Sequence, residues 1–159
     1  MKKIVMLIVV FTCMIGCDSR NEARVHEFKD ICIKMGADKS HEFEVSIERF
    51  KQLDSKKQEE VLESARGELL EHNKRTAMAD LKIICTAVEQ SITCGKKVKT
   101  IADLVGSDNY LKKLPRDPWG NEYRLDIDER KTDAGWPTVK VICAGPDGRF
   151  GTDDDIIHL

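Results

Sequence analysis

The run Leu114-Pro115-Arg116-Asp117-Pro118-Trp119-Gly120-Asn121 separates two parts of the chain that differ in residue pattern. Proline fixes the backbone dihedral φ and lacks an amide donor, so the run predicts a rigid turn segment. All four prolines of the 159-residue chain lie in this run or after it. The residues before the run therefore favour helices, and the residues after it favour strands and turns.

After the run, short stretches of apolar residues alternate with polar ones, as in half-buried β-strands. These stretches are residues 123–127, 139–143 and 155–159. They predict a small antiparallel sheet, with a polar connection over residues 130–135.

Before the run, apolar residues recur at intervals of three and four, which is typical of amphipathic helices. We expect helices over residues 25–35, 43–50 and 61–92, and a short helix over residues 101–105. Residues 19–22 are expected to be a polar tether, and residues 55–58 to form a capping box. Helices followed by a sheet give an α+β fold, with a helical N-terminal stalk and a head of helix plus sheet.

The N-terminal residues indicate export to the cell envelope. Residues 4–16 are apolar apart from Thr12 and follow two lysines, but they are shorter than the roughly 20 residues that a membrane-spanning helix needs. Met14-Ile15-Gly16-Cys17 resembles the lipobox of bacterial lipoproteins, which implies cleavage after residue 16 and a lipid such as palmitate on Cys17. Asp18 resembles an inner-membrane retention signal. The alternative is an ordinary signal peptide with an incidental cysteine.

The composition favours a folded protein that does not bind nucleic acid. Hydrophobic residues make up 41% and charged residues 34% of the chain, and the formal net charge is −2. No nucleophile, phosphate-binding or zinc-protease motif occurs, and four scattered histidines accompany no serine or cysteine pattern. We therefore expect neither an enzyme nor a small-molecule substrate.

Four cysteines would remain after lipidation of Cys17. They are Cys32, Cys85, Cys94 and Cys143. In an oxidising periplasm they could form disulfides in three complete pairings. A bridge between Cys85 and Cys94 is disfavoured, because nine residues of one helix span about 13.5 Å. The pairing stays open.

Residues 144–156 form a loop that concentrates negative charge. Four aspartates lie within nine positions of it. In extended backbone Asp153 and Asp155 point to one side and Asp154 to the other, and Asp147 lies across the loop. Ca²⁺ takes carboxylate and carbonyl oxygens, so three convergent carboxylates suggest a calcium site. The alternative is a solvated acidic loop.

The runs at residues 110–123 and 145–156 together resemble the major pseudopilin of type II secretion systems, the GspG family. That resemblance covers about residues 76–159. It implies a calcium loop with Asp147, Asp153 and Asp155 as side-chain ligands and backbone carbonyls from Ala144 and Arg149. It also implies a link to secretion-system or other envelope proteins as partners.

The start of the chain departs from the family, whose members begin with a basic leader, Phe-Thr-Leu-x-Glu and a long apolar helix. We therefore expect a signal peptide over residues 1–16, a lipid-anchored helical stalk over 17–75 and a calcium-binding head over 76–159. The leading hypothesis is a periplasm-facing lipoprotein with a non-enzymatic assembly or binding role. The alternatives are a divergent pseudopilin subunit acting in secretion and an envelope hydrolase.

Overall fold

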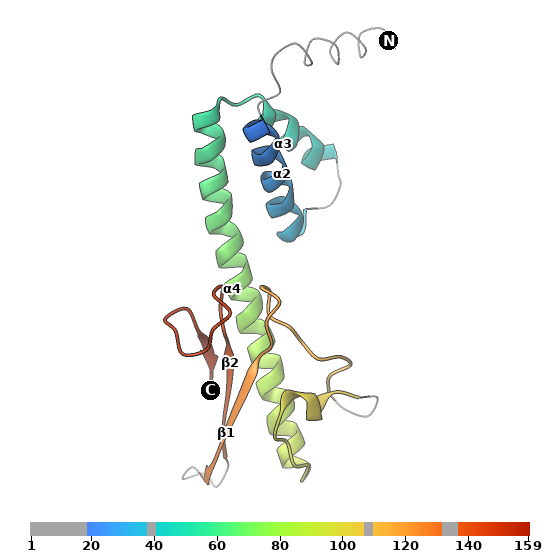
Figure 1. Cartoon of the computed structure of the whole chain (residues 1–159). Coiled ribbons are helices and arrows are strands. Elements are labelled where there is room, and N and C mark those ends of the chain that lie inside the picture. The colour runs from blue at the N-terminus through green and yellow to red at the C-terminus, as the bar shows by residue number, and fades with distance from the viewer. Residues whose placement is uncertain (1–18, 38–40, 107–109, 132–136) are drawn as a thin grey trace. The chain divides into compact units, whose positions relative to one another are not determined.

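A computed structural model describes residues 19–37, 41–106, 110–131 and 137–159 (Figure 1). The chain divides into two compact units, one ending at Leu70 and the other running from Glu71 to Leu159. Within the described ranges, no helix combines the length and the apolar character needed to cross a membrane. The expected signal peptide and the expected lipidation site, Cys17, lie outside the described residues.

The N-terminal unit is helical. It contains α2 (Ser19–Lys34), α3 (His41–Lys51) and the first part of α4 (Ser55–Thr93). Its buried apolar residues are Ile31, Phe43, Ile47, Phe50 and Leu62. The ring of Phe28 stacks on that of Phe50 with 4.4 Å between centroids. The helical periodicity of this region is confirmed. The polar tether expected over residues 19–22 is wrong, because α2 already begins at Ser19.

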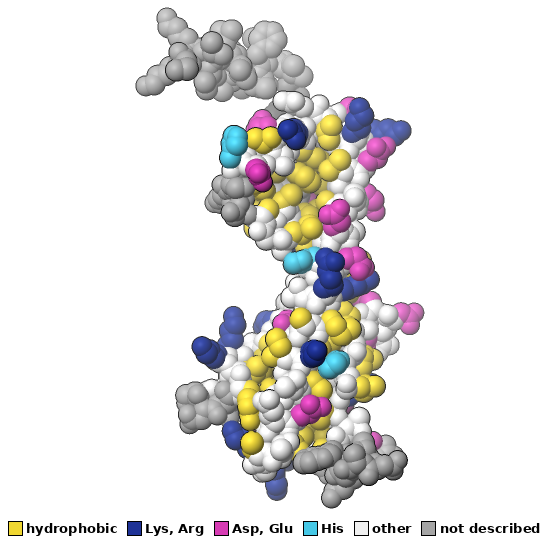
Figure 2. All heavy atoms as spheres, turned by 180° about the vertical axis from the view of Figure 1, so that it is seen from behind, with side chains coloured by type: hydrophobic (Ala, Val, Ile, Leu, Met, Phe, Trp, Pro, Cys, Tyr) yellow, Lys and Arg dark blue, Asp and Glu magenta, His cyan; other side chains and the backbone are white. Residues whose placement is uncertain are grey.

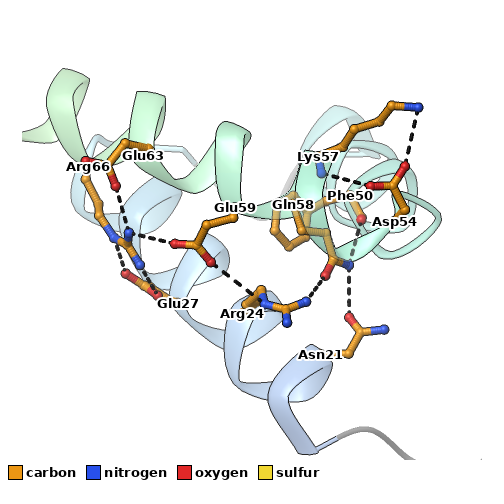
Figure 3. A network of polar contacts seen from close by, with 10 residues as sticks. All are labelled: Asn21, Arg24, Glu27, Phe50, Asp54, Lys57, Gln58, Glu59, Glu63 and Arg66. Atoms are coloured by element: carbon orange, nitrogen blue, oxygen red, sulfur yellow. Dashed lines mark hydrogen bonds and ion pairs between the residues drawn. The ribbon is translucent and has the colours of Figure 1, made fainter.

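A buried glutamine connects the helices of this unit (Figure 3). Gln58 is 1% exposed, and its amide nitrogen donates to Asn21 Oδ1 at 2.9 Å and to the Phe50 carbonyl at 3.2 Å. Its amide oxygen accepts from the Arg24 guanidinium at 2.7 Å. Because three partners satisfy both ends of the amide, its burial carries little desolvation penalty and orients α2 against α4.

An arginine forms a further polar link between α2 and α4. Arg66 donates two hydrogen bonds to Glu27, at 2.7 and 2.9 Å, and further bonds to Glu59 and Glu63 on its own helix. The hydrogen bond from Arg66 lowers the pKa of Glu27. These groups are well exposed to solvent, so the cluster adds orientation more than stability.

Helix α4 begins one residue earlier than the expected capping box implies. The Asp54 carboxylate accepts from the Lys57 amide at 3.0 Å, which makes Asp54 the N-cap in place of Ser55. That amide hydrogen bond lowers the pKa of Asp54. The helix then continues without a break through residues 72–75 to Thr93.

The C-terminal unit packs the second half of α4 against a sheet. The strands are β1 (Arg124–Lys131), β2 (Pro137–Cys143) and β3 (Ile156–His158), antiparallel in the order β1-β2-β3. A 3₁₀ helix, η1 (Ile101–Leu104), stands where a short helix was expected. Strand β1 extends to Lys131, into the stretch expected to be a polar connection.

The core of this unit lies between one face of α4 and the sheet. Four buried helix residues at intervals of four, three and four pack on buried residues of β2 and on the side chain just before β1. The helix contributes Ala77, Leu81, Ile84 and Val88, and the sheet side contributes Tyr123, Val139, Val141 and Cys143. Figure 2 shows, on one face of this unit, many hydrophobic side chains with charged side chains both among them and around them. The expected α+β fold is confirmed.

Candidate metal site

The turn that precedes β1 is organised around a buried carboxylate. Asp117 is 4% exposed, and its Oδ1 accepts from the backbone amides of Trp119 and Asn121 at 3.0 and 2.7 Å. Its Oδ2 accepts from the Cys143 thiol and from the side-chain amide of Asn121, both at 3.3 Å. Four donors thus compensate the removal of this charge from water.

Asn121 connects this turn to the acidic loop. Its side-chain nitrogen donates to the Gly145 carbonyl at 3.3 Å, across 24 residues of sequence. A Cβ added at Gly148 would lie 3.0 Å from Asn121 Oδ1, so the loop also passes close to this side chain on a second side. The proline-rich turn and the aspartate-rich loop are therefore one structural site.

The thiol of Cys143 lies between the turn and the loop. Burial raises its pKa to about 12, and the negative charges of Asp117 and Asp155 act in the same direction. The thiol stays protonated and donates to Asp117. Nearby in this unit, the Tyr123 hydroxyl donates to Asp80 at 2.9 Å, and burial raises the pKa of Tyr123.

Asp154 takes part in the loop, in contrast to the expected outward orientation. Its Oδ1 accepts from the Thr152 hydroxyl at 2.6 Å, and its Oδ2 accepts from the Asp147 amide at 3.1 Å. The Thr152 hydrogen bond is the main cause that lowers the pKa of Asp154. The strict alternation of an extended strand does not apply here, because β3 begins only at Ile156.

The three expected carboxylate ligands differ in their surroundings. Asp147 Oδ1 accepts from the Arg149 amide at 2.7 Å, and Asp153 is exposed. Asp155 Oδ2 accepts from the Gly151 amide at 2.7 Å, whereas its Oδ1 is buried and has no hydrogen-bond partner among the described residues. A buried carboxylate oxygen without a donor is unfavourable unless a cation compensates it.

The donor chemistry of the loop fits a hard cation, although the ligands are not preassembled. In the described part of the chain, no three His, Cys, Asp or Glu side chains are grouped so that they could hold a metal ion. The two residues expected to supply backbone carbonyls also have different surroundings. Ala144 is fully buried, and the Arg149 carbonyl already accepts a hydrogen bond from the Thr152 hydroxyl at 3.1 Å. Oxygen donors from carboxylates and backbone carbonyls are those that Ca²⁺ prefers.

The four cysteines expected in the mature chain form no disulfide bond with one another in the structure. Cys85 and Cys143 are buried, Cys32 is half-buried and Cys94 is exposed. Cys94 Sγ lies 3.8 Å from the Tyr110 hydroxyl.

The hydrogen bond from Asn121 to the Gly145 carbonyl was not predicted from the sequence. The pair Gly120-Asn121 is typical of a turn, but a turn signal does not indicate which distant group the asparagine side chain contacts.

Comparison with known proteins gives a consistent family. The family model for type II secretion system (T2SS), protein G matches residues 71–158, which is the C-terminal unit apart from Leu159. The type II secretion system core protein G of Escherichia coli K12 is 36% identical over 69 residues, which are 43% of this chain and 44% of that protein. The core protein G of Dickeya chrysanthemi is 45% identical over 49 residues, 31% of this chain and 29% of that protein.

A solved structure is also similar. The crystal structure of the major pseudopilin from the type 2 secretion system of enterohaemorrhagic Escherichia coli matches with a TM-score of 0.46 and 24% identity. The match covers 58% of this chain and 90% of that one. The chain spans less than half the length of each of the two core proteins named above.

The close approach of the backbone at Gly145 predicts that alanine destabilises the protein more there than at Gly151. Gly145 and Gly151 both have positive φ, +65° and +93°, so alanine at either position costs about 1–2 kcal/mol of stability. A Cβ at Gly145 would also lie 2.5 Å from the Asp154 carbonyl oxygen, whereas nothing lies within 4 Å at Gly151. We expect Gly145→Ala to cost about 1–3 kcal/mol more than Gly151→Ala.

Urea unfolding followed by tryptophan fluorescence measures this difference, because both tryptophans, Trp119 and Trp136, belong to the C-terminal unit. Equal losses for the two variants would mean that Asp154 does not lie against Gly145.

Proposed function

The chain belongs to the type II secretion system protein G family, and we propose that it acts in protein secretion as a pseudopilin-type subunit whose head is stabilised by calcium. The observation that carries this proposal is the match of the family over residues 71–158, because that range covers one compact unit almost completely. It includes the second half of α4, the whole sheet and the acidic loop. The role assigned here is structural and not enzymatic.

The comparisons support the pseudopilin hypothesis better than an envelope lipoprotein that merely reuses the head. The relatives are core proteins of type II secretion systems. Partners in the same secretion apparatus and a place in the cell envelope follow from this role. An envelope hydrolase receives no support from them.

Calcium is proposed to hold the loop between β2 and β3. Asp147, Asp153 and Asp155 would supply carboxylate oxygens, and Ala144 and Arg149 backbone carbonyls. The support is the buried Asp155 Oδ1 that lacks a donor, together with the all-oxygen chemistry of the loop. When bound, the cation supplies positive charge that offsets the repulsion between these carboxylates.

Asp154 has a different role from the proposed ligands. Its two carboxylate oxygens are already engaged by the Thr152 hydroxyl and the Asp147 amide. We assign it to shaping the loop. Substitution of Asp154 is therefore unsuitable as a neutral control in a calcium experiment.

A lipid on Cys17 is proposed to tether the chain to the membrane. The support is the sequence Met14-Ile15-Gly16-Cys17 after a short apolar stretch. The protein would then face the periplasm, and Asp18 favours the inner membrane. Several acyl chains, each worth about 0.8 kcal/mol per buried CH₂ group, give stable anchoring.

The secretion role predicts a defect in export. Deleting the gene in its native host should leave type II substrates in the periplasm and deplete them from the medium, and the wild-type gene should restore export. The measurement is the share of a type II substrate found in the medium. Unchanged export in the deletion strain would refute a role as a required subunit.

The calcium proposal predicts stabilisation by the ion. At free calcium about 100 times the dissociation constant, the full chain should gain roughly 2.7 kcal/mol of stability, visible as a higher melting temperature than in EDTA. Asp155→Asn should lose most of this gain, because it removes the charge at the buried oxygen. Asp126→Asn is the control, since Asp126 is an exposed residue of β1 that pairs with Arg124 at 3.4 Å. Coincident melts with and without calcium would contradict the proposal.

The lipid anchor predicts a labelling difference between two neighbouring cysteines. Cys17→Ser should abolish palmitate incorporation, because it removes the thiol that is proposed to carry the lipid. Cys13→Ser should keep it, since Cys13 lies within the stretch to be cleaved. Labelling of the two variants in cells with radioactive palmitate tests this, and labelling of Cys17→Ser at the level of the unchanged chain would exclude Cys17 as the lipid site.

A further inference from the structure

The turn before β1 fixes the orientation of Asn121 before its side chain reaches the acidic loop. The Asn121 backbone amide donates to Asp117 Oδ1 at 2.7 Å, and its backbone carbonyl accepts from the Asp117 amide at 2.9 Å. Its side-chain nitrogen also donates to Asp117 Oδ2 at 3.3 Å. Because an amide nitrogen carries two protons, the second one can reach the Gly145 carbonyl, also at 3.3 Å. Asn121 therefore forms a bridge from a buried carboxylate to the loop.

The bridge ends where the two ends of the acidic loop meet. A Cβ added at Gly145 would lie 2.5 Å from the Asp154 carbonyl oxygen and 2.7 Å from Asp154 Oδ2. Asp154 directly precedes Asp155, whose buried Oδ1 has no hydrogen-bond partner in the described part of the chain. The hydrogen bond from Asn121 thus fixes the start of the loop beside the backbone that leads to Asp155.

Asn121 lies close to the loop at a second position as well. The Gly145 carbonyl accepts from the Gly148 amide at 3.4 Å, and a Cβ added at Gly148 would lie 3.0 Å from Asn121 Oδ1. Asp147, one of the proposed ligands, lies between these two glycines in the chain. Asn121 therefore restricts the backbone on both sides of Asp147.

A group placed in this way affects how strongly the loop binds a cation. Ordering an acidic loop costs free energy, because its carboxylates repel each other when no cation compensates them. Groups that fix the loop backbone in advance lower this cost and so raise the affinity. Replacing such partners of metal ligands typically weakens metal binding by about 10-fold to 100-fold.

We propose that Asn121 is a positioning residue that raises the affinity of the acidic loop for calcium without ligating the ion. The inference rests on the proposed calcium site and deepens it, because it makes the proline-rich turn before β1 a determinant of the calcium affinity. The turn contributes through one side chain, which joins the Asp117 carboxylate to the Gly145 carbonyl.

The first experiment measures the dissociation constant for calcium in the full chain by isothermal titration calorimetry. Asn121→Ala keeps every proposed ligand and removes the bridge, so we expect its dissociation constant to rise by about 10-fold to 100-fold. Tyr123→Phe is the matched control. It removes a hydroxyl that donates to Asp80 at 2.9 Å, so it also deletes one side-chain hydrogen bond near the start of β1, but one that leads to α4 and not to the loop. Its calcium affinity should equal that of the unchanged chain.

A second experiment uses the unsubstituted chain and so does not depend on the folding of a variant. Because coupling is reciprocal, a bridge that favours calcium binding must itself be favoured by calcium. Calcium should therefore slow the exchange of the Asn121 side-chain amide protons with water, measured by NMR on the isotope-labelled chain. Asn73 is the control, since it lies on α4 in the same unit and outside the turn and the loop.

The outcomes separate this inference from the calcium proposal. If the unchanged chain binds no calcium, both are refuted. If it binds calcium and Asn121→Ala binds equally well, or Tyr123→Phe loses as much affinity, the calcium site stands and the positioning role is refuted. A lower melting temperature of Asn121→Ala in EDTA with an unchanged dissociation constant would show a purely structural role. In a chain that binds the ion, exchange at Asn121 that calcium leaves unchanged also overturns the inference.

Discussion

The buried carboxylate of Asp117 is the constraint on which the head of this protein depends. It must be compensated because it is almost completely removed from water, and its donors come from its own turn and from the end of β2. Through Asn121 the same turn holds the Gly145 carbonyl. The turn before β1, the end of β2 and the start of the acidic loop are thereby fixed to one another, and loss of this carboxylate would leave several donors unpaired at once.

The acidic loop combines two different solutions to the crowding of negative charge. Asp154 is satisfied by a hydroxyl and an amide within the loop. Asp155 is satisfied on one oxygen only, and its other oxygen is buried without a donor among the described residues. This difference between the two neighbouring carboxylates is the physical basis of the calcium proposal, because a cation would compensate the oxygen that lacks a donor.

The N-terminal unit reaches stability by another route. Its buried apolar side chains are Ile31, Phe43, Ile47, Phe50 and Leu62. The buried side-chain amide of Gln58 adds to that core, because its hydrogen bonds join α2, α3 and α4 and give both its nitrogen and its oxygen a partner. Since polar contacts of this kind depend on geometry, they specify one arrangement of the helices more strictly than apolar contact alone.

The sequence by itself determined the α+β class, the helices, the approximate strands and the family resemblance of the C-terminal unit, because periodicity and turn residues act between near neighbours in the chain. The sequence patterns predicted the wrong N-cap of α4 and the wrong orientation of Asp154. Asp54 and Asp154 each accept a backbone hydrogen bond that neither the capping-box motif nor strand alternation indicates. Only the tertiary structure decided which distant groups meet. The Cys143 thiol reaches Asp117 across 26 residues and Asn121 reaches Gly145 across 24, and such contacts depend on the path of the whole chain.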